Sequence, residues 1–210
     1  MRLDGRQLGP VYFVTDAGAP ATVPDQVRAA VTAGVGIIQL RDKHASDAEF
    51  AKLAAALLCI TRAAGAALIV NDRVDVAIEI EANGLHVGQG DGDIAAIRRR
   101  IGPDMILGLS VETLAQIGSI PPDSVDYLGV GPLRATATKP DAAEPLGLDG
   151  MARIIAATPL PCVAIGGIKP GDAGAIRRMG AAGIAVVSAI SREADMVRTA
   201  RELIAEWEAT

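Results

Sequence analysis

The chain is poor in aromatic residues and in cysteine, and both shortages narrow the classes of protein to which it can belong. Aromatic residues make up only 2% of its 210 residues, so Ala, Val, Ile and Leu must fill the core. That composition suits parallel strands that are covered by helices on both faces. Two cysteines, Cys59 and Cys162, are too few for a disulfide scaffold, and we expect both to be small buried hydrophobic residues in a reducing cytoplasm.

The sequence also lacks an excess of positive charge and any long apolar run. A net charge of −5 disfavours a nucleic-acid partner, although it leaves room for a local basic pocket that binds an anionic ligand. Apolar runs such as residues 63–70 are too short to cross a membrane, and Arg2, Asp4 and Arg6 interrupt any signal sequence. We therefore expect one cytoplasmic domain over residues 1–210, with a homo-oligomer left open.

Short β-branched segments alternate with longer Ala-rich amphipathic segments, which is the pattern of repeated β–α units. The expected strands cover residues 11–15, 36–41, 67–71, 84–88, 105–109, 127–130, 162–165 and 183–187. The expected helices cover residues 24–33, 47–64, 74–81, 94–101, 112–117, 148–157, 171–179 and 196–209. This favours a (β/α)8 TIM barrel in the α/β class over an open doubly wound sheet, because no glycine-rich dinucleotide motif follows the first strand.

Polar residues occur where the second, third and fourth expected strands end, which is where barrel enzymes carry their active sites. Gln39, Arg41 and Lys43 share one face of an extended segment, and two cations with an amide suit a phosphate or diphosphate. Asp72 and Asp91 follow the next two strands, and paired carboxylates beside a cationic site suit Mg2+. The alternatives are solvated surface cations and helix-capping aspartates, the second being strongest for Asp91.

Two further residues in this region have plain structural interpretations. His86 lies in the fourth expected strand, and we expect it to be a hydrogen-bonded structural histidine rather than a metal ligand or a base. Ser110 follows the fifth strand and, by itself, is expected to be a helix N-cap.

A second anion site is predicted after the last three strands. The segment 131–147 is long for a barrel loop, and its Thr136, Thr138 and Lys139 indicate a lid that binds an oxyanion. Gly166 and Gly167 would let a ligand approach the backbone, in the loops that form the recurrent phosphate site of these barrels. A mobile surface loop, and glycines needed only for a tight turn, are the alternatives.

In combination, these motifs resemble the thiamine-phosphate synthase family. The segments that carry the resemblance are residues 11–16, 39–43, 70–73, 84–89 with Asp91, 108–110, 131–132 with Thr136, Thr138 and Lys139, 145–147, 164–168 and 187–188. The resemblance implies an Mg2+-dependent transferase of a pyrimidinylmethyl group. It would couple hydroxymethylpyrimidine diphosphate to hydroxyethylthiazole phosphate, release diphosphate, and so form thiamine phosphate.

The resemblance also implies roles for particular residues. It assigns the pyrimidine diphosphate to Gln39, Leu40, Arg41, Asp42, Lys43, Asn71, Ser110 and Lys139. It assigns the thiazole phosphate to Thr136, Ala137, Thr138, Gly166, Gly167, Val187 and Ser188. Asp72 and Asp91 would hold Mg2+, and the residues expected to act in catalysis are Arg41, Lys43, Ser110 and Lys139.

Two positions bear on which activity the resemblance implies. Arg134 stands where the family often has an aromatic or apolar residue, which puts the thiazole contact in question. The related thiazole tautomerase has a histidine at the position of Glu112, so the synthase is favoured here. A phosphate-binding barrel isomerase and a catalytically silent barrel that binds thiamine phosphate stay open as competing functions.

Overall fold

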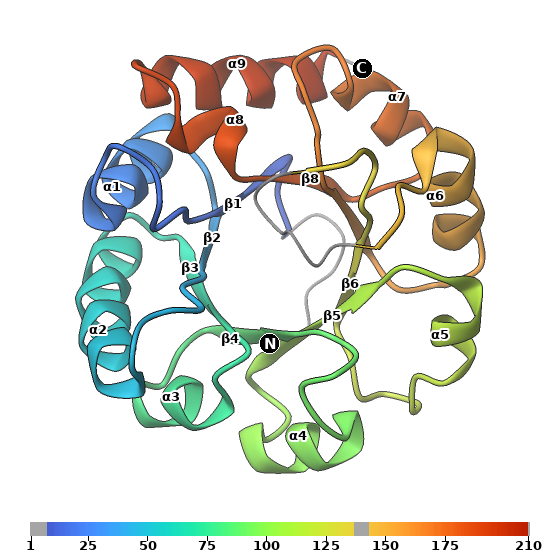
Figure 1. Ribbon diagram of the computed structural model, residues 1–210, viewed down its shortest axis with the longest axis horizontal. Helices are drawn as coiled ribbons and strands as arrows, with labels where there is room; N and C mark the ends of the chain where they lie inside the picture. Colours follow the sequence, from blue (N-terminus) through green and yellow to red (C-terminus); the bar gives the residue numbers. More distant parts are fainter. Residues whose placement is uncertain (1–7, 137–142, 210) are drawn as a thin grey trace.

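The chain folds as a closed barrel of eight parallel strands with helices packed around it (Figure 1). The computed structural model describes residues 8–136 and 143–209. The strands are β1 Val11–Val14, β2 Ile37–Leu40, β3 Ala67–Asn71, β4 Gly84–Val87, β5 Ile106–Val111, β6 Tyr127–Val130, β7 Cys162–Ile165 and β8 Gly183–Val186. Each strand pairs with its neighbours in the chain, and β8 pairs with β1, which confirms the predicted (β/α)8 barrel.

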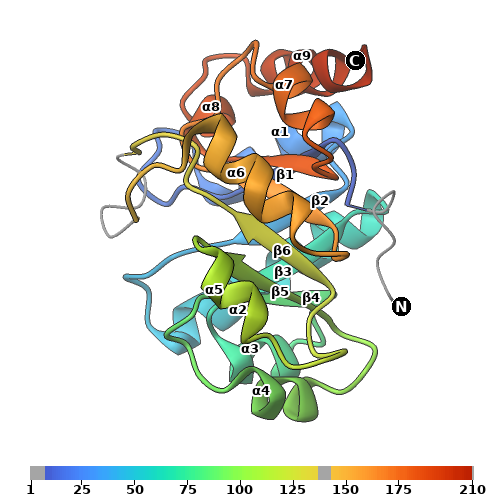
Figure 2. The ribbon, with the colours of Figure 1, turned by 90° about the vertical axis from the view of Figure 1, so that its right-hand side faces the viewer.

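The helices follow the strands in regular alternation and cover the outside of the barrel (Figures 1 and 2). They are α1 Val23–Ala33, α2 Asp47–Ala63, α3 Val74–Glu79, α4 Ile94–Ile101, α5 Leu114–Gly118, α6 Gly147–Ala156, α7 Ala173–Arg178, α8 Ser188–Ser191 and α9 Met196–Glu208. In the described part of the chain, no helix is long and apolar enough to span a bilayer.

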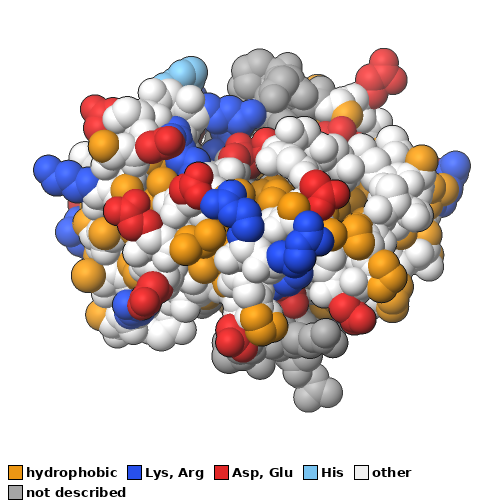
Figure 3. Space-filling view, turned by 90° about the horizontal axis from the view of Figure 1, so that it is seen from below, with side chains coloured by type: hydrophobic (Ala, Val, Ile, Leu, Met, Phe, Trp, Pro, Cys, Tyr) orange, Lys and Arg blue, Asp and Glu red, His pale blue; other side chains and the backbone are white. Residues whose placement is uncertain are grey.

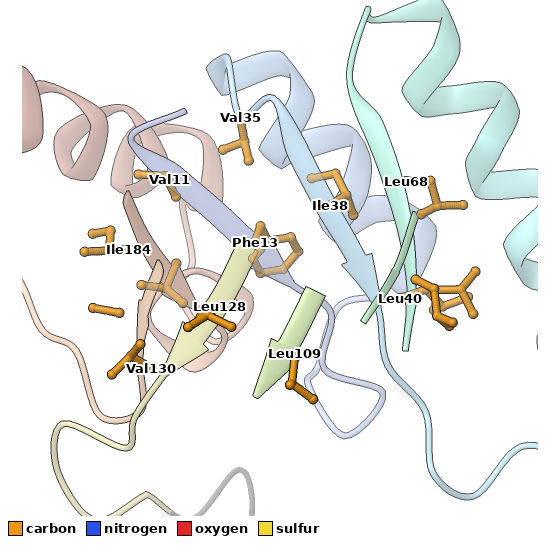
Figure 4. Close-up of a cluster of buried hydrophobic side chains, with 14 of the residues drawn as sticks. Val11, Phe13, Val35, Ile38, Leu40, Leu68, Leu109, Leu128, Val130 and Ile184 are labelled. Atoms are coloured by element: carbon orange, nitrogen blue, oxygen red, sulfur yellow. The ribbon is translucent and has the colours of Figure 1, made fainter. Parts of the chain in front are cut away.

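Alternate side chains of each strand face the helices and the barrel interior, as the period of a strand requires. On β1, Val11 and Phe13 join the aliphatic core between strands and helices (Figure 4). Tyr12, between them, belongs to a separate cluster inside the barrel. On β2, Ile38 and Leu40 likewise face outward. The interior positions are therefore the ones that can reach a ligand in the mouth of the barrel.

The ends of the expected elements agree with the structure to within two residues, and three local differences affect the site. Asp93, not Asp91, caps α4 by accepting from the backbone of Ala96. Thr113 caps α5, so β5 continues to Val111 and Ser110 lies within the strand rather than at a helix cap. The short helix α8, directly after β8, was not expected from the sequence.

The two cysteines differ, and the expectation that both are buried is wrong for one of them. Cys59 lies on the solvent-facing side of α2 and is exposed. Cys162 is buried at the start of β7, where burial raises the pKa of its thiol to about 12. Cys162 therefore behaves as the expected inert hydrophobic residue.

The outer surface carries mixed charge. On the side of the molecule shown in Figure 3, basic and acidic side chains are interspersed with apolar ones, and the basic side chains do not gather into one stripe.

Candidate active site

A cavity of about 430 Å³ opens at the carboxyl ends of the strands. All eight strands or the loops that follow them contribute to its wall. The predicted site residues that line it are Gln39, Arg41, Lys43, Asn71, Asp72, Asp91, Ser110, Thr136, Gly166, Gly167, Val187 and Ser188. Residues predicted from separate parts of the sequence are thus brought to one mouth.

Two of the predicted side chains are placed otherwise, and three predicted residues lie outside the described part of the chain. The Leu40 side chain packs in the outer core, and Asp42 turns away to accept hydrogen bonds from the backbone of the loop after β2. Neither side chain lines the cavity, because the alternation that directs Gln39 and Arg41 inward directs these two outward. Ala137, Thr138 and Lys139 lie outside the described residues.

One side of the cavity is built from charged side chains after β2, β3 and β4. We call Arg41, Lys43, Asp72 and Asp91 the charged side. The loop that carries its two cations is held by Arg73, whose guanidinium donates to the carbonyl oxygens of Asp42 (3.1 Å) and Ala45 (2.5 Å). The Arg73 side chain also pairs with Asp47 and lies over the ring of Phe50, at 4.5 Å from its centroid.

The two aspartates of the charged side lie close enough for Asp91 to influence the titration of Asp72. Burial and the neighbouring Asp91 raise the pKa of Asp72 to about 6, although Lys43 and Arg41 oppose the shift. Asp91 also accepts from the backbone N–H of Gly88 (2.6 Å). Neither aspartate caps a helix, since the N-cap position of α3 is Arg73, which makes no side-chain cap, and α4 is capped by Asp93.

This pair of carboxylates fits a divalent cation that is completed by a ligand. Two carboxylates held in contact repel each other, and a cation between them would remove that cost. No group of three or more acidic, histidine or cysteine side chains that could hold a metal occurs within residues 8–136 and 143–209. The arrangement therefore matches Mg2+, which is often held by one or two carboxylates together with substrate phosphates.

The opposite side of the cavity is made largely of backbone after β7 and β8. We call Gly166, Gly167, Val187 and Ser188 the backbone side. Gly166 has φ 92° and Gly167 has φ 67°, and residues with a side chain rarely adopt such positive φ angles. A Cβ on Gly166 would lie 2.4 Å from the Cβ of Pro132, so the two loops touch through glycine.

Arg134, in the loop after β6, holds that loop against the loop after β7, which carries the two glycines of the backbone side. Its guanidinium donates to both carboxylate oxygens of Asp172, at 2.6 and 2.8 Å, and to the carbonyl oxygen of Gly167 at 3.1 Å. Its backbone N–H donates to the carbonyl oxygen of Gly166 at 3.0 Å. In this chain the unusual arginine after Gly131-Pro132 is therefore a clamp between loops and not a wall of the cavity.

The floor of the cavity holds polar residues that sequence reasoning missed. Tyr12 and Tyr127 are buried, line the cavity, and donate to or accept from each other at 2.9 Å. His86 bonds to Tyr127 through Nδ1 (2.9 Å) and to Ser110 through Nε2 (3.0 Å), which confirms it as a hydrogen-bonded strand histidine. The alternation along β1 could have placed Tyr12 inside the barrel.

The fold and site together define the class: a (β/α)8 barrel with a cavity at the carboxyl ends of its strands, lined by charged side chains on one side and by glycine-rich backbone on the other. The family described as thiamine monophosphate synthase matches residues 11–190 of the chain. The chain belongs to this family.

Individual relatives agree over nearly the whole length. The thiamine-phosphate synthase of Chloroflexus aurantiacus is 47% identical over 195 residues, which is 92% of this chain and 90% of the relative. The enzyme of Laribacter hongkongensis is 44% identical and covers 93% of each chain. The solved structure of thiamine phosphate pyrophosphorylase from Pyrococcus furiosus superimposes with a TM-score of 0.88 at 32% identity, covering 98% of both chains.

Proposed function

We propose that the chain is a transferase that couples hydroxymethylpyrimidine diphosphate to hydroxyethylthiazole phosphate and releases diphosphate. The observation that carries this proposal is the division of one cavity into a charged side and a backbone side. A diphosphate that leaves during the reaction needs strong charge stabilisation, whereas a monophosphate that is only bound can be held by backbone groups. Relatives that are 47% and 44% identical and are named thiamine-phosphate synthase support it.

The reaction begins when the bond between the pyrimidine methylene carbon and the diphosphate oxygen breaks. The bonding electrons leave with the diphosphate, and the positive charge on the methylene carbon is delocalised into the pyrimidine ring. The thiazole nitrogen then donates its lone pair to this carbon and forms the new C–N bond. This nitrogen carries no proton, so the coupling step needs no general base.

The residues of the charged side would stabilise the leaving group. Arg41 offers a planar fork to phosphate oxygens, and Lys43 adds a second positive charge. Asp72 and Asp91 would hold Mg2+, which when bound neutralises the negative charge that develops on the diphosphate. Lys139, outside the described residues, is assigned the same role by the family resemblance.

The cavity walls between the two sides suit the two rings. Val14, Ile165 and Ala185 line the cavity with apolar surface, and Gln39 offers the only amide on β2. Apolar walls limit the water that could otherwise react with the pyrimidine cation. The thiazole phosphate would be held by the backbone side, with Thr136 at its edge.

The direct test is to mix the purified protein with both substrates and Mg2+ and to measure diphosphate. We expect release only when both substrates and the metal are present. Absence of release with all three would refute the proposal. Conversion of a thiazole phosphate isomer without diphosphate release would instead favour a tautomerase.

A further inference from the structure

Five side chains on five strands form a continuous hydrogen-bonded chain across the cavity floor. Gln39 Nε2 donates to the hydroxyl of Tyr12 at 2.8 Å, and the two tyrosine hydroxyls are 2.9 Å apart. The hydroxyl of Tyr127 contacts His86 Nδ1 at 2.9 Å, and His86 Nε2 contacts the hydroxyl of Ser110 at 3.0 Å. The chain thus joins a buried amide at one end to a half-buried hydroxyl that lines the cavity at the other.

Two glycines within strands make room for the rings of Tyr127 and His86 in this hydrogen-bonded chain. A Cβ on Gly108 of β5 would lie 2.2 Å from the ring of Tyr127, and a Cβ on Gly129 of β6 would lie 3.0 Å from the ring of His86. Glycine within a strand weakens it, and a glycine at such a place marks close approach of another group. The local sequence therefore accommodates the two rings at the expense of strand propensity.

The order of donors along the chain follows from counting hydrogens. Tyr12 accepts from Gln39, and no third partner of its hydroxyl occurs in the described residues. If Tyr12 also accepted from Tyr127, the hydrogen of this buried hydroxyl would have no acceptor among the described residues, which is costly. Tyr12 therefore donates to Tyr127.

The rest of the order is then forced for a neutral imidazole. Tyr127 accepts from Tyr12 and donates its own hydrogen to His86 Nδ1, so the ring carries its hydrogen on Nε2. His86 Nε2–H donates to Ser110, whose oxygen is then the acceptor. Burial raises the pKa of both tyrosines above the ordinary value, so both hydroxyls keep the hydrogens that this order requires.

We propose that Tyr12, Tyr127 and His86 form a relay that fixes the His86 tautomer and turns the Ser110 hydroxyl hydrogen into the cavity. Ser110 then offers a fixed donor to an acceptor atom of the bound diphosphate substrate, which rests on the function proposed above. Tyr127 and His86 are positioning residues that act through Ser110.

The tautomer can be measured without substrate. The chain has two histidines, His44 and His86, so labelling with 15N-histidine gives two sets of ring signals, and His44→Gln assigns them. We expect His86 to show a hydrogen-bearing Nε2 and a hydrogen-free Nδ1. The opposite tautomer, or an equal mixture of both, would overturn the relay.

A set of variants tests whether the relay acts through Ser110. Tyr127→Phe removes the hydroxyl that contacts Nδ1, and we expect kcat/KM for the diphosphate substrate to fall about fivefold. The KM for thiazole phosphate should stay unchanged. Tyr12→Phe removes the tyrosine hydroxyl that lies one hydrogen bond further from His86. Its effect should be smaller, because Tyr127 can still donate to His86.

The decisive comparison is between single and double variants. If Tyr127 acts through Ser110, Tyr127→Phe should cause no further loss in a Ser110→Ala background. Independent, multiplying losses would overturn the positioning role, as would a Tyr12→Phe effect larger than that of Tyr127→Phe. If the unmodified protein releases no diphosphate at all, the proposed function fails, while the tautomer measurement still decides the relay.

Discussion

The charged side and the backbone side of the cavity hold anions by different means. On the charged side, Arg41, Lys43 and two carboxylates come from side chains after β2, β3 and β4. On the backbone side, two glycines with positive φ after β7 and the start of α8 after β8 form the wall. The contrast corresponds to two tasks, because a leaving diphosphate gains charge during the reaction and a bound monophosphate does not.

Each side nevertheless depends on an arginine that does not line the cavity. Arg73 holds the loop of the charged side, and its side chain is 19% exposed. Arg134 holds the loops of the backbone side, and its side chain is 42% exposed. Because the Arg73 guanidinium is the more buried of the two and its hydrogen bonds to two carbonyl oxygens are shielded from water, we expect the loss of Arg73 to be the more damaging.

The largest effect is expected from the two carboxylates that we propose to hold Mg2+. Asp91→Asn keeps an acceptor for the Gly88 N–H but removes a negative charge from the pair that would hold Mg2+. We expect diphosphate release to fall about 100-fold or more, with a higher Mg2+ requirement. Asp93→Asn is the matched control, since asparagine still caps α4, and it should remain close to the unmodified rate.

For the second carboxylate, asparagine is also the better substitution. Asp72 has φ 62°, a backbone conformation that asparagine tolerates and alanine does not. Equal Mg2+ dependence in Asp72→Asn, Asp91→Asn and the unmodified protein would contradict the metal assignment.

A smaller effect, confined to the other substrate, is expected from Gly167→Ala. Its Cβ would lie 2.9 Å from the Cβ of Arg134, so the loops of the backbone side must separate. We expect the KM for thiazole phosphate to rise about tenfold, with little change for the diphosphate substrate. Gly171→Ala is the control, because Gly171 also has positive φ but has open space around it. Equal effects of both variants would show that backbone strain alone matters.

Loss of Arg73, which holds the loop of the charged side, should affect the charged side only. Arg73→Met releases the carbonyl oxygens of Asp42 and Ala45, and we expect the KM for the diphosphate substrate to rise about fivefold. Arg100→Met removes an exposed arginine paired with Asp75, away from the cavity, and should change neither KM. A change in thiazole-phosphate KM in Arg73→Met would argue against separate sides.

The smallest effect is expected from the loss of Arg134. Arg134→Met should raise the KM for thiazole phosphate about threefold, and Asp172→Asn should add nothing to it in the double variant. Hydrogen bonding to Arg134 holds the pKa of the Asp172 carboxyl below its usual value. The pair therefore stabilises the fold above the usual carboxyl pKa, and this contribution is lost as pH falls through the lowered pKa. Thermal unfolding of the unmodified protein and of Arg134→Met, measured across that pH range, checks the sign of the change in stability.

The barrel and much of its mouth could be predicted from the sequence, because they follow from the repeated β–α units and from the alternation of side chains along each strand. Strand alternation placed Gln39 and Arg41 on one face, and the same rule, applied to Leu40 and Asp42, would have excluded their side chains from the cavity. Capping was harder to predict, because Asp91 and Asp93 offer the same chemistry two residues apart.

The floor of the cavity could not be predicted because its contacts join distant strands. Tyr12 and Tyr127 are 115 residues apart, and nothing local to either indicates the other. A glycine inside a strand, such as Gly108, indicates that another group lies close to it. Only the closed barrel shows that this group is the ring of Tyr127. Helix α8 was missed because four residues are too few to show a helical period.

The most direct test of the two-sided cavity is a crystal structure with Mg2+, diphosphate and inorganic phosphate bound together. We predict diphosphate against Arg41 and Lys43, with the metal bridging it to Asp72 and Asp91, and phosphate against Gly167 and Ser188. Both anions on the same side, or a metal that contacts neither aspartate, would contradict the account.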